Sequence, residues 1–228
     1  MGERVTFKTN GVTTAGYLAR SAKRGPGIIV IQEWWGLVPQ IEHVADRLAS
    51  EGFVALAPDL YHGQTTKSPD EAGKLMMSLR VDEAERDLAA AIDYLVSLPG
   101  VKVVTGPKVG TIGFCMGGAL SLYAACKNPE VGACVVFYGG HPNIKPDVRS
   151  LGAPVLGIFA GQDTFVSPQV VAALDRQLTE LGKPHTFHTY PDANHAFFNE
   201  ERPEVYDPAA AKDAWAKTLA FFRRELRA

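Results

Sequence analysis

The chain has 228 residues, 46% of them hydrophobic and 21% charged, and a formal net charge of -2. This length suits one domain with a substantial core, predicted over residues 1–228, and the near-neutral charge argues against nucleic acid as a partner. No run approaches the roughly 18 apolar residues of a membrane span, and the three cysteines lack paired spacing. We therefore expect a cytoplasmic protein, a monomer or weak homodimer, without a membrane partner.

Strands and helices are predicted to alternate along the chain. Residues 5–8 and 14–18, separated by an Asn-Gly turn, should form a hairpin, and 61–79 a loop or short helix. After residue 26, short apolar runs typical of buried strands alternate with segments whose apolar residues have helical spacing. Strands are expected at 27–31, 53–57, 108–112, 133–138, 154–160 and 185–190, and helices at 39–50, 81–98, 119–125, 168–181 and 208–226. This alternation predicts an α/β domain with a mostly parallel, doubly wound sheet and flanking helices.

A Gly-x-Cys-x-Gly motif lies where a buried strand is followed by a helix. Gly113 and Gly117 flank Cys115 at the spacing of a nucleophile elbow, a sharp turn that lifts one reactive atom above the sheet. The free amides and positive dipole end of the next helix favour a negatively charged sulfur. Cys126 and Cys134 lie in apolar runs and are interpreted as small core residues. We predict that Cys115 is a nucleophile.

Two loops beyond the elbow offer an acid and a base in the chain order of α/β-hydrolases. Asp163 follows one predicted strand and His195 the next, so both should reach the edge where the strands end. An imidazole can take the proton of a thiol, and a buried aspartate can fix its tautomer. Asp163 could instead be only a turn residue. Asp192 is a rival acid, although its place three residues before His195 favours turn chemistry.

Glu33 adds a carboxylate that a plain triad does not need. It ends the first central strand, beside the expected elbow, where it could hold the thiol or take its proton. The simpler interpretation is the polar end of a strand. The backbone amides of Trp34 and Met116 are the expected oxyanion donors, one after that strand and one directly after the nucleophile.

Five stretches spread over nearly the whole chain carry a family resemblance. They are Gln32-Glu33-Trp34-Trp35-Gly36, Pro58-Asp59-Leu60-Tyr61, Gly113-Phe114-Cys115-Met116-Gly117-Gly118, Gly161-Gln162-Asp163-Thr164-Phe165-Val166 and His195-Ala196-Phe197. Together they resemble the dienelactone hydrolase family, the carboxymethylenebutenolidase-like α/β-hydrolases. The combination of Gln-Glu-x-x-Gly with a cysteine elbow is more specific than any one of the motifs.

The resemblance implies an α/β-hydrolase fold and a Cys115, His195, Asp163 triad. Glu33 would hold the thiol until substrate binds and then help to deprotonate it, with the Trp34 and Met116 amides stabilising the oxyanion. The implied reaction is hydrolysis of a small unsaturated lactone or related ester through a thioester, without cofactor or metal.

The sequence departs from this family where substrate is recognised. Dienelactone-cleaving members hold the substrate carboxylate with two arginines, and Asn199 stands at one of those positions. Arg80 and Arg202 could substitute, although a surface salt bridge would explain either. An apolar, aromatic pocket is the other expectation, with core packing accounting for some of its candidates: Trp34, Trp35, Tyr61, Met76, Met77, Phe197 and Phe198.

Two further classes of function remain open from the sequence. A thioesterase or peptidase of the same fold would use the same thiol. A non-catalytic binding or thiol-sensing protein would need Cys115 but neither Asp163 nor His195.

Overall fold

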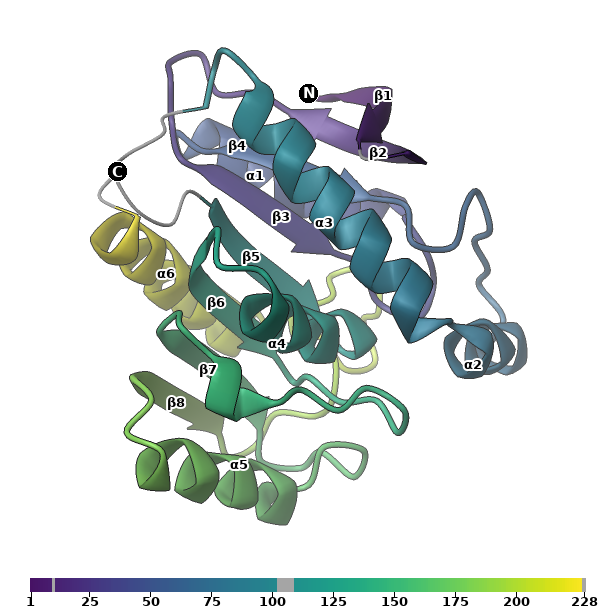
Figure 1. Ribbon diagram of the computed structural model, residues 1–228. Coiled ribbons are helices and arrows are strands. Elements are labelled where there is room, and N and C mark those ends of the chain that lie inside the picture. The colour runs from purple at the N-terminus through teal and green to yellow at the C-terminus, as the bar shows by residue number, and fades with distance from the viewer. Residues whose placement is uncertain (10, 102–108, 227–228) are drawn as a thin grey trace.

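A computed structural model describes residues 1–9, 11–101 and 109–226 (Figure 1). An eight-stranded sheet forms its centre, in the spatial order β1-β2-β4-β3-β5-β6-β7-β8. The strands are β1 (Glu3–Thr9), β2 (Val12–Ala19), β3 (Gly27–Ile31), β4 (Val54–Pro58), β5 (Val109–Phe114), β6 (Val131–Phe137), β7 (Val155–Ala160) and β8 (His185–Tyr190). The β1–β2 and β2–β4 pairs are antiparallel, and all other neighbours in the sheet are parallel.

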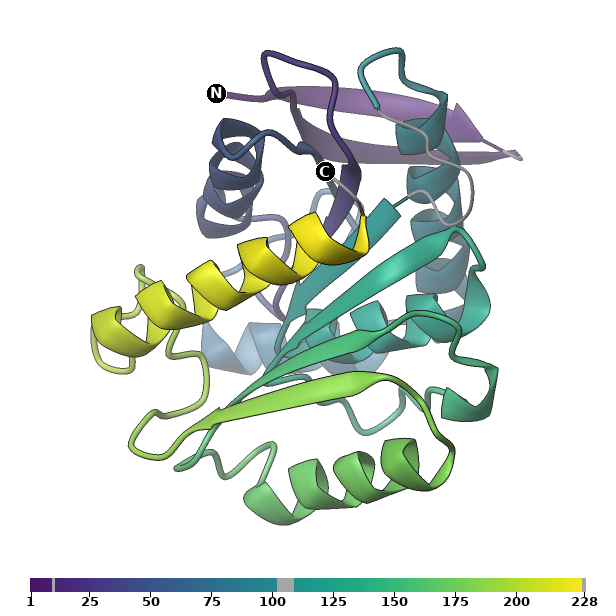
Figure 2. The same ribbon diagram turned by 90° about the vertical axis from the view of Figure 1, so that its left-hand side faces the viewer.

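Helices cover both faces of this sheet. They are α1 (Pro39–Ser50), α2 (Pro69–Ser78), α3 (Val81–Ser97), α4 (Met116–Lys127), α5 (Pro168–Glu180) and α6 (Pro208–Glu225), with a short 3-10 turn, η1 (Val148–Ser150). Figure 2 shows α1 and α6 on one face and α3 and α4 on the other. α5 packs along the edge strand β8, while α2 lies beyond the end of the sheet (Figure 1). Within the described ranges, no helix is long and apolar enough to cross a membrane.

The predicted α/β architecture is confirmed, with local differences. Residues 69–78 form a regular helix because Ser68 accepts the Glu71 amide at its start and Pro69 supplies a fixed first residue. Most strand and helix ends differ from the prediction by one or two residues. Asn10 of the expected Asn-Gly turn and most of the connector 100–107 lie outside the described residues.

The parallel strands gather polar side chains at one end of the sheet. Every residue of β3, β4, β5 and β7 is buried, so these strands can be apolar throughout. Polar and reactive residues therefore stand directly after the strands, where the backbone leaves the sheet. They are Glu33 after β3, Asp59 after β4, Cys115 after β5, Tyr138 after β6, Asp163 after β7 and His195 after β8.

Two glycines allow β5 to turn directly into α4. A Cβ atom on Gly113 would overlap the carbonyl oxygen of Gly117, and one on Gly117 would overlap the carbonyls of Ile31 and Gln32 at the end of β3. The obstructing atoms are backbone, so no side-chain rotation can relieve the overlap. The glycine spacing of the motif thus reflects how closely three backbone segments pass.

We expect Gly113→Ala to destabilise the protein by about 1–3 kcal/mol or more, because overpacked backbone must shift. For a chain of this size, each kcal/mol lowers the melting temperature by roughly 2–4 °C, measurable by calorimetry. Gly73→Ala is the matched control, because Gly73 lies inside α2 with nothing near its missing Cβ. It should stabilise the protein by about 0.5–1 kcal/mol. Equal melting temperatures for Gly113→Ala and the natural chain would contradict this account.

Candidate active site

Cys115 occupies a strained backbone position between β5 and α4. Its φ of 55° and ψ of -120° place it in a region that residues other than glycine rarely adopt. The conformation is held by its own backbone, because its amide donates to the carbonyl of Phe137 and its carbonyl accepts the amides of Gly118 and Gly140. The side chain lies at the start of α4 with 6% of its surface exposed. The turn therefore presents the sulfur beside the free amides of a helix N-terminus.

The carboxylate of Asp163 is fixed on both of its oxygens. Oδ1 accepts the backbone amides of Phe165 and Val166, each at 2.8 Å. Oδ2 pairs with Nδ1 of His195 at 2.6 Å. Asp163 is 3% exposed, whereas Asp192 is exposed at the surface. Asp163 is thus the carboxylate that orients the imidazole.

His195 lies between this carboxylate and the thiol. Burial acts to lower the pKa of His195, but hydrogen bonds to Asp163 and Cys115 and the charges of both groups raise it to about 10. Since Asp163 engages Nδ1, the thiol's partner is Nε2. The rings of Tyr138 and Phe165 contact the imidazole edge to face, with centroids 5.0 and 5.4 Å away. The ring is thus held in position by this packing and by the hydrogen bond between Nδ1 and Asp163.

Glu33 is a buried carboxylate within the same site. Its side chain is 2% exposed, Oε2 accepts the Nδ2–H of Asn199 at 2.8 Å, and Oε1 accepts the hydroxyl of Tyr138 at 3.5 Å. Burial raises the pKa of Glu33, against the opposing effect of these hydrogen bonds and of the charges on His195 and Arg202. Among the described residues, the hydrogen-bond partners of Glu33 are therefore two neutral donors, Asn199 and Tyr138.

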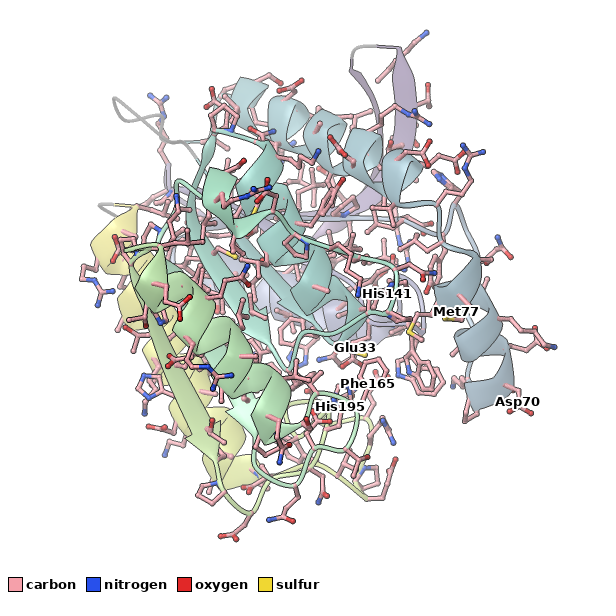
Figure 3. All side chains as sticks on the ribbon, turned by 60° about the horizontal axis from the view of Figure 1, so that its bottom comes forward. Glu33, Asp70, Met77, His141, Phe165 and His195 are labelled. Atoms are coloured by element: carbon pink, nitrogen blue, oxygen red, sulfur yellow. The ribbon has the colours of Figure 1, made fainter. Side chains whose placement is uncertain are left out.

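These groups open into one cavity of about 180 Å³. Figure 3 shows Glu33, Phe165 and His195 together at the end of the sheet, with Met77 on α2 to one side. The lining combines the reactive groups with a mostly apolar wall: Glu33, Trp34, Trp35, Met76, Cys115, Phe165, His195, Ala196 and Arg202. The arrangement places a thiol and an imidazole paired with a carboxylate around a cavity with room for a compact substrate.

The dienelactone hydrolase family model matches residues 14–226 of the chain. The chain belongs to this family. It is 41% identical to protein usf of Aquifex pyrophilus, over 99% of this chain and 100% of that protein. It is 38% identical to the "Putative carboxymethylenebutenolidase" of Aquifex aeolicus, over 100% of both. A dienelactone hydrolase-like promiscuous phosphotriesterase from metagenomic libraries superposes with a TM-score of 0.86 at 25% identity, covering 99% of this chain and 98% of that one.

Membership in the dienelactone hydrolase family has two direct consequences. The sheet and its helices are an α/β-hydrolase fold, and the protein is a hydrolase of carboxylic esters or lactones.

The candidate oxyanion donors belong to two different segments of the site. Trp34 directly follows Glu33 and lines the cavity, and Met116 is the first residue of α4. Tyr61, predicted to line the pocket, is buried instead below the elbow, where its hydroxyl donates to the sulfur of Met116 at 3.3 Å. Tyr61 therefore supports the residue after the nucleophile.

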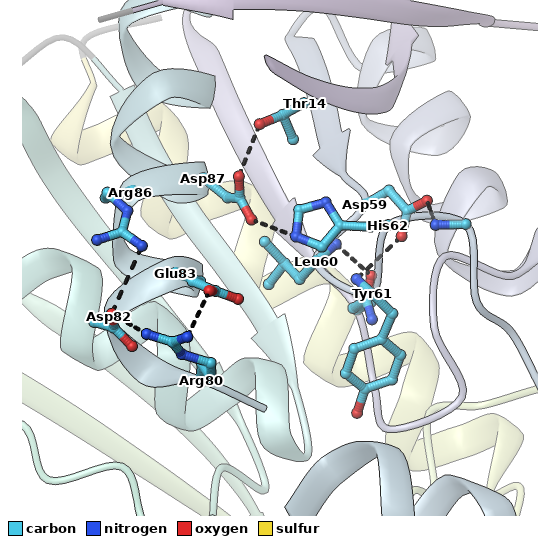
Figure 4. A network of polar contacts seen from close by, with 12 residues as sticks. Thr14, Asp59, Leu60, Tyr61, His62, Arg80, Asp82, Glu83, Arg86 and Asp87 are labelled. Carbon is cyan, nitrogen blue, oxygen red and sulfur yellow. Dashed lines mark hydrogen bonds and ion pairs between the residues drawn. The ribbon is translucent and has the colours of Figure 1, made fainter. Parts of the chain in front are cut away.

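Three further residues predicted for the pocket lie elsewhere. Arg80 stands at the start of α3 with its side chain 64% exposed, paired with Asp82 and Glu83 (Figure 4). Phe197 and Phe198 are buried in the core, where Phe198 stacks on Phe114 at 5.3 Å. An aromatic residue that follows such a histidine can point either to the pocket or to the core. Here the side chains of both Phe197 and Phe198 point into the core.

Sequence reasoning missed three contributors to the dienelactone hydrolase site. Tyr138 directly follows β6 with a positive φ of 38°, and its position after a parallel strand was the available signal. Phe165, two residues after Asp163, forms part of the cavity wall although its side chain is 47% exposed. Asn199 is bound to Glu33, yet nothing in the sequence links the two residues.

We expect Glu33→Gln to gain stability relative to the natural chain as pH rises. Because the folded-state pKa of Glu33 is raised above 4.5, folding favours the protonated form. The natural chain therefore loses this contribution as pH increases through the raised pKa, at about 1.4 kcal/mol per unit of pKa shift. Urea unfolding from pH 4 to pH 9 measures the difference.

Glu180→Gln, which removes an exposed carboxylate at the end of α5, gives the baseline for that series. The expectation would be contradicted if the difference in unfolding free energy between Glu33→Gln and the natural chain were constant over the whole pH range. The charge of the buried Glu33 would then be fully compensated by its partners.

Proposed function

We propose that this protein cleaves a small lactone or carboxylic ester through a thioester formed on Cys115, without a cofactor. The observation that supports this most directly is the 2.6 Å contact that fixes the imidazole of His195 to Asp163, with His195 and Cys115 lining the same cavity. A thioesterase or peptidase reaction would use the same residues. The compact cavity favours a small substrate over a peptide or a long acyl chain.

In the first half-reaction, Nε2 of His195 takes the thiol proton while the sulfur of Cys115 attacks the carbonyl carbon. The negative charge that develops on the carbonyl oxygen would meet the amides of Trp34 and Met116. Collapse of the tetrahedral species breaks the bond to the alcohol oxygen, which receives the proton from His195. In a lactone this alcohol remains part of the same molecule.

In the second half-reaction, water replaces the alcohol. His195 takes a proton from the water as its oxygen attacks the thioester carbonyl, and returns a proton to the departing sulfur. Asp163 stabilises the imidazolium in both halves without taking its proton. All proton transfers thus have a partner within the chain's own side chains.

We expect Cys115→Ala to abolish hydrolysis of short activated esters such as 4-nitrophenyl acetate, because the acyl acceptor is lost. Cys126→Ala and Cys134→Ala are the matched controls, since both thiols are buried away from the cavity and should leave activity within about twofold. Treatment with EDTA should also leave it unchanged.

Mass spectrometry of the intact protein with a slow ester should show an acyl adduct that Cys115→Ala lacks. Full activity in Cys115→Ala would refute the proposal. Reversible oxidation of Cys115 without turnover of any ester would support the thiol-sensing alternative.

We expect Arg202 to favour substrates with a carboxylate. Its guanidinium lines the cavity, 5.9 Å from the centre of the Trp35 ring, and pairs with the exposed Glu204 at 2.8 Å. Arg202→Gln should therefore lower the kcat/KM ratio of carboxylate-bearing to matched neutral aryl esters by about tenfold or more, the value of a charged hydrogen bond.

Arg80→Gln is the control for this measurement, because Arg80 lies outside the cavity in exposed ion pairs. An unchanged ratio in Arg202→Gln would mean that the apolar wall alone selects the substrate.

A further inference from the structure

The side-chain amide of Asn199 has a fixed orientation. Asn199 is 2% exposed, and its Oδ1 accepts the backbone amide of Glu201 at 3.0 Å. A backbone N–H can only donate, so the oxygen of the side-chain amide must face Glu201. The nitrogen then necessarily points to Glu33, where Nδ2 donates to Oε2 at 2.8 Å. Asn199 thus presents a donor to this carboxylate and cannot present an acceptor without breaking its own turn.

Glu33 depends on this donor more than on any other neighbour. The hydroxyl of Tyr138 is 3.5 Å from Oε1, a long and weak hydrogen bond. The titratable and charged groups that face Glu33 are Tyr138 after β6, His195 and Arg202 in the segment after β8, and Cys115 after β5. Of these, His195 and Arg202 act on Glu33 through space, so among the described residues Asn199 supplies the one short side-chain hydrogen bond to this carboxylate.

We infer that Asn199 is a positioning residue that fixes the carboxylate of Glu33 in the cavity that Glu33 shares with Cys115 and His195. The inference rests on the proposed function, because it assigns Glu33 a role beside the reacting thiol. The contact that supports it, between Asn199 and Glu33, does not depend on that function. It adds to the expected role of Glu33: Asn199 holds one oxygen of the carboxylate in place, so that Glu33 acts as a fixed charge in the cavity.

Removing the donor should make Glu33 easier to protonate. In Asn199→Asp, two carboxylate oxygens would meet at the position of the 2.8 Å contact, and such a pair shares a proton at a raised pH. In Asn199→Ser, the hydroxyl can keep the turn to the Glu201 amide but is too short to reach Glu33. Both changes should move the protonation of Glu33 upward in pH, one by repulsion and one by loss of a hydrogen bond.

The test compares pH profiles in two backgrounds. Asn199→Asp and Asn199→Ser are made in the natural chain and in Glu33→Gln. Two rates are measured from pH 5 to pH 10: kcat/KM for 4-nitrophenyl acetate and alkylation of Cys115 by iodoacetamide. Asn128→Asp is the matched control, because Oδ1 of Asn128 accepts the amide of Glu130 at 2.9 Å in the same kind of turn, outside the cavity.

The acid limbs of both profiles should move up by about one pH unit or more in the Asn199 variants, as expected when a buried carboxylate gains a like charge or loses its donor. In the Glu33→Gln background, the Asn199 changes should move neither profile. Asn128→Asp should move neither profile of the natural chain. Equal shifts in both backgrounds, or a loss of rate without a shift, would overturn the inference. If Asn199→Asp does not fold, Asn199→Ser decides. If the natural chain hydrolyses no ester, the proposed function fails while the alkylation profiles still test the positioning of Glu33.

Discussion

The close passage of three backbones at the elbow is the constraint on which the site depends. Gly113 and Gly117 lie where any side chain would strike a carbonyl of α4 or β3, and Cys115 between them has a positive φ. A backbone conformation of this kind costs on the order of 1–3 kcal/mol and persists only where the surroundings enforce it. Here the enforcement comes from the buried strand before Cys115 and the buried helix after it. The strain is therefore supported by the core.

The second constraint is that polar groups in the site are satisfied before substrate arrives. Asp163 receives two backbone amides and one imidazole, and Glu33 receives Asn199 and Tyr138. Buried charges without such partners would be costly in the mostly apolar surroundings of the cavity. Because these contacts are already formed, the groups need little rearrangement as charge develops, which is the arrangement that electrostatic catalysis requires.

Much of this architecture could be predicted from local patterns. A strand such as Gly27–Ile31 is apolar at every position because helices cover both of its faces, and this distinguishes it from a surface strand. The convergence of Cys115, Asp163 and His195 likewise follows from the rule that parallel strands end at one edge. These features depend on residues near one another in sequence or on fold-wide geometry.

The remaining features depend on contacts between distant segments. Nothing in the local sequence reveals whether Phe197 and Phe198 turn to the pocket or to the core, because the deciding neighbours, such as Phe114, lie far away along the chain. Arg80 was a candidate by position alone, and its pairing with Asp82 and Glu83 follows from where α3 begins. Asn199 and Glu33 are 166 residues apart, so their hydrogen bond could be found only in three dimensions.

The attachment of α2 has a different consequence. This helix supplies Met76 to the cavity and is tied to the loop after β6 by His141, whose Nε2 lies 3.0 Å from the Met76 carbonyl while Nδ1 accepts the Asn143 amide. The tie uses backbone atoms of α2, so the side chains of that helix are free to vary without losing it. The reacting groups, in contrast, all stand at strand ends. Substitutions on α2 can therefore change one wall of the cavity while the residues at the strand ends stay in place.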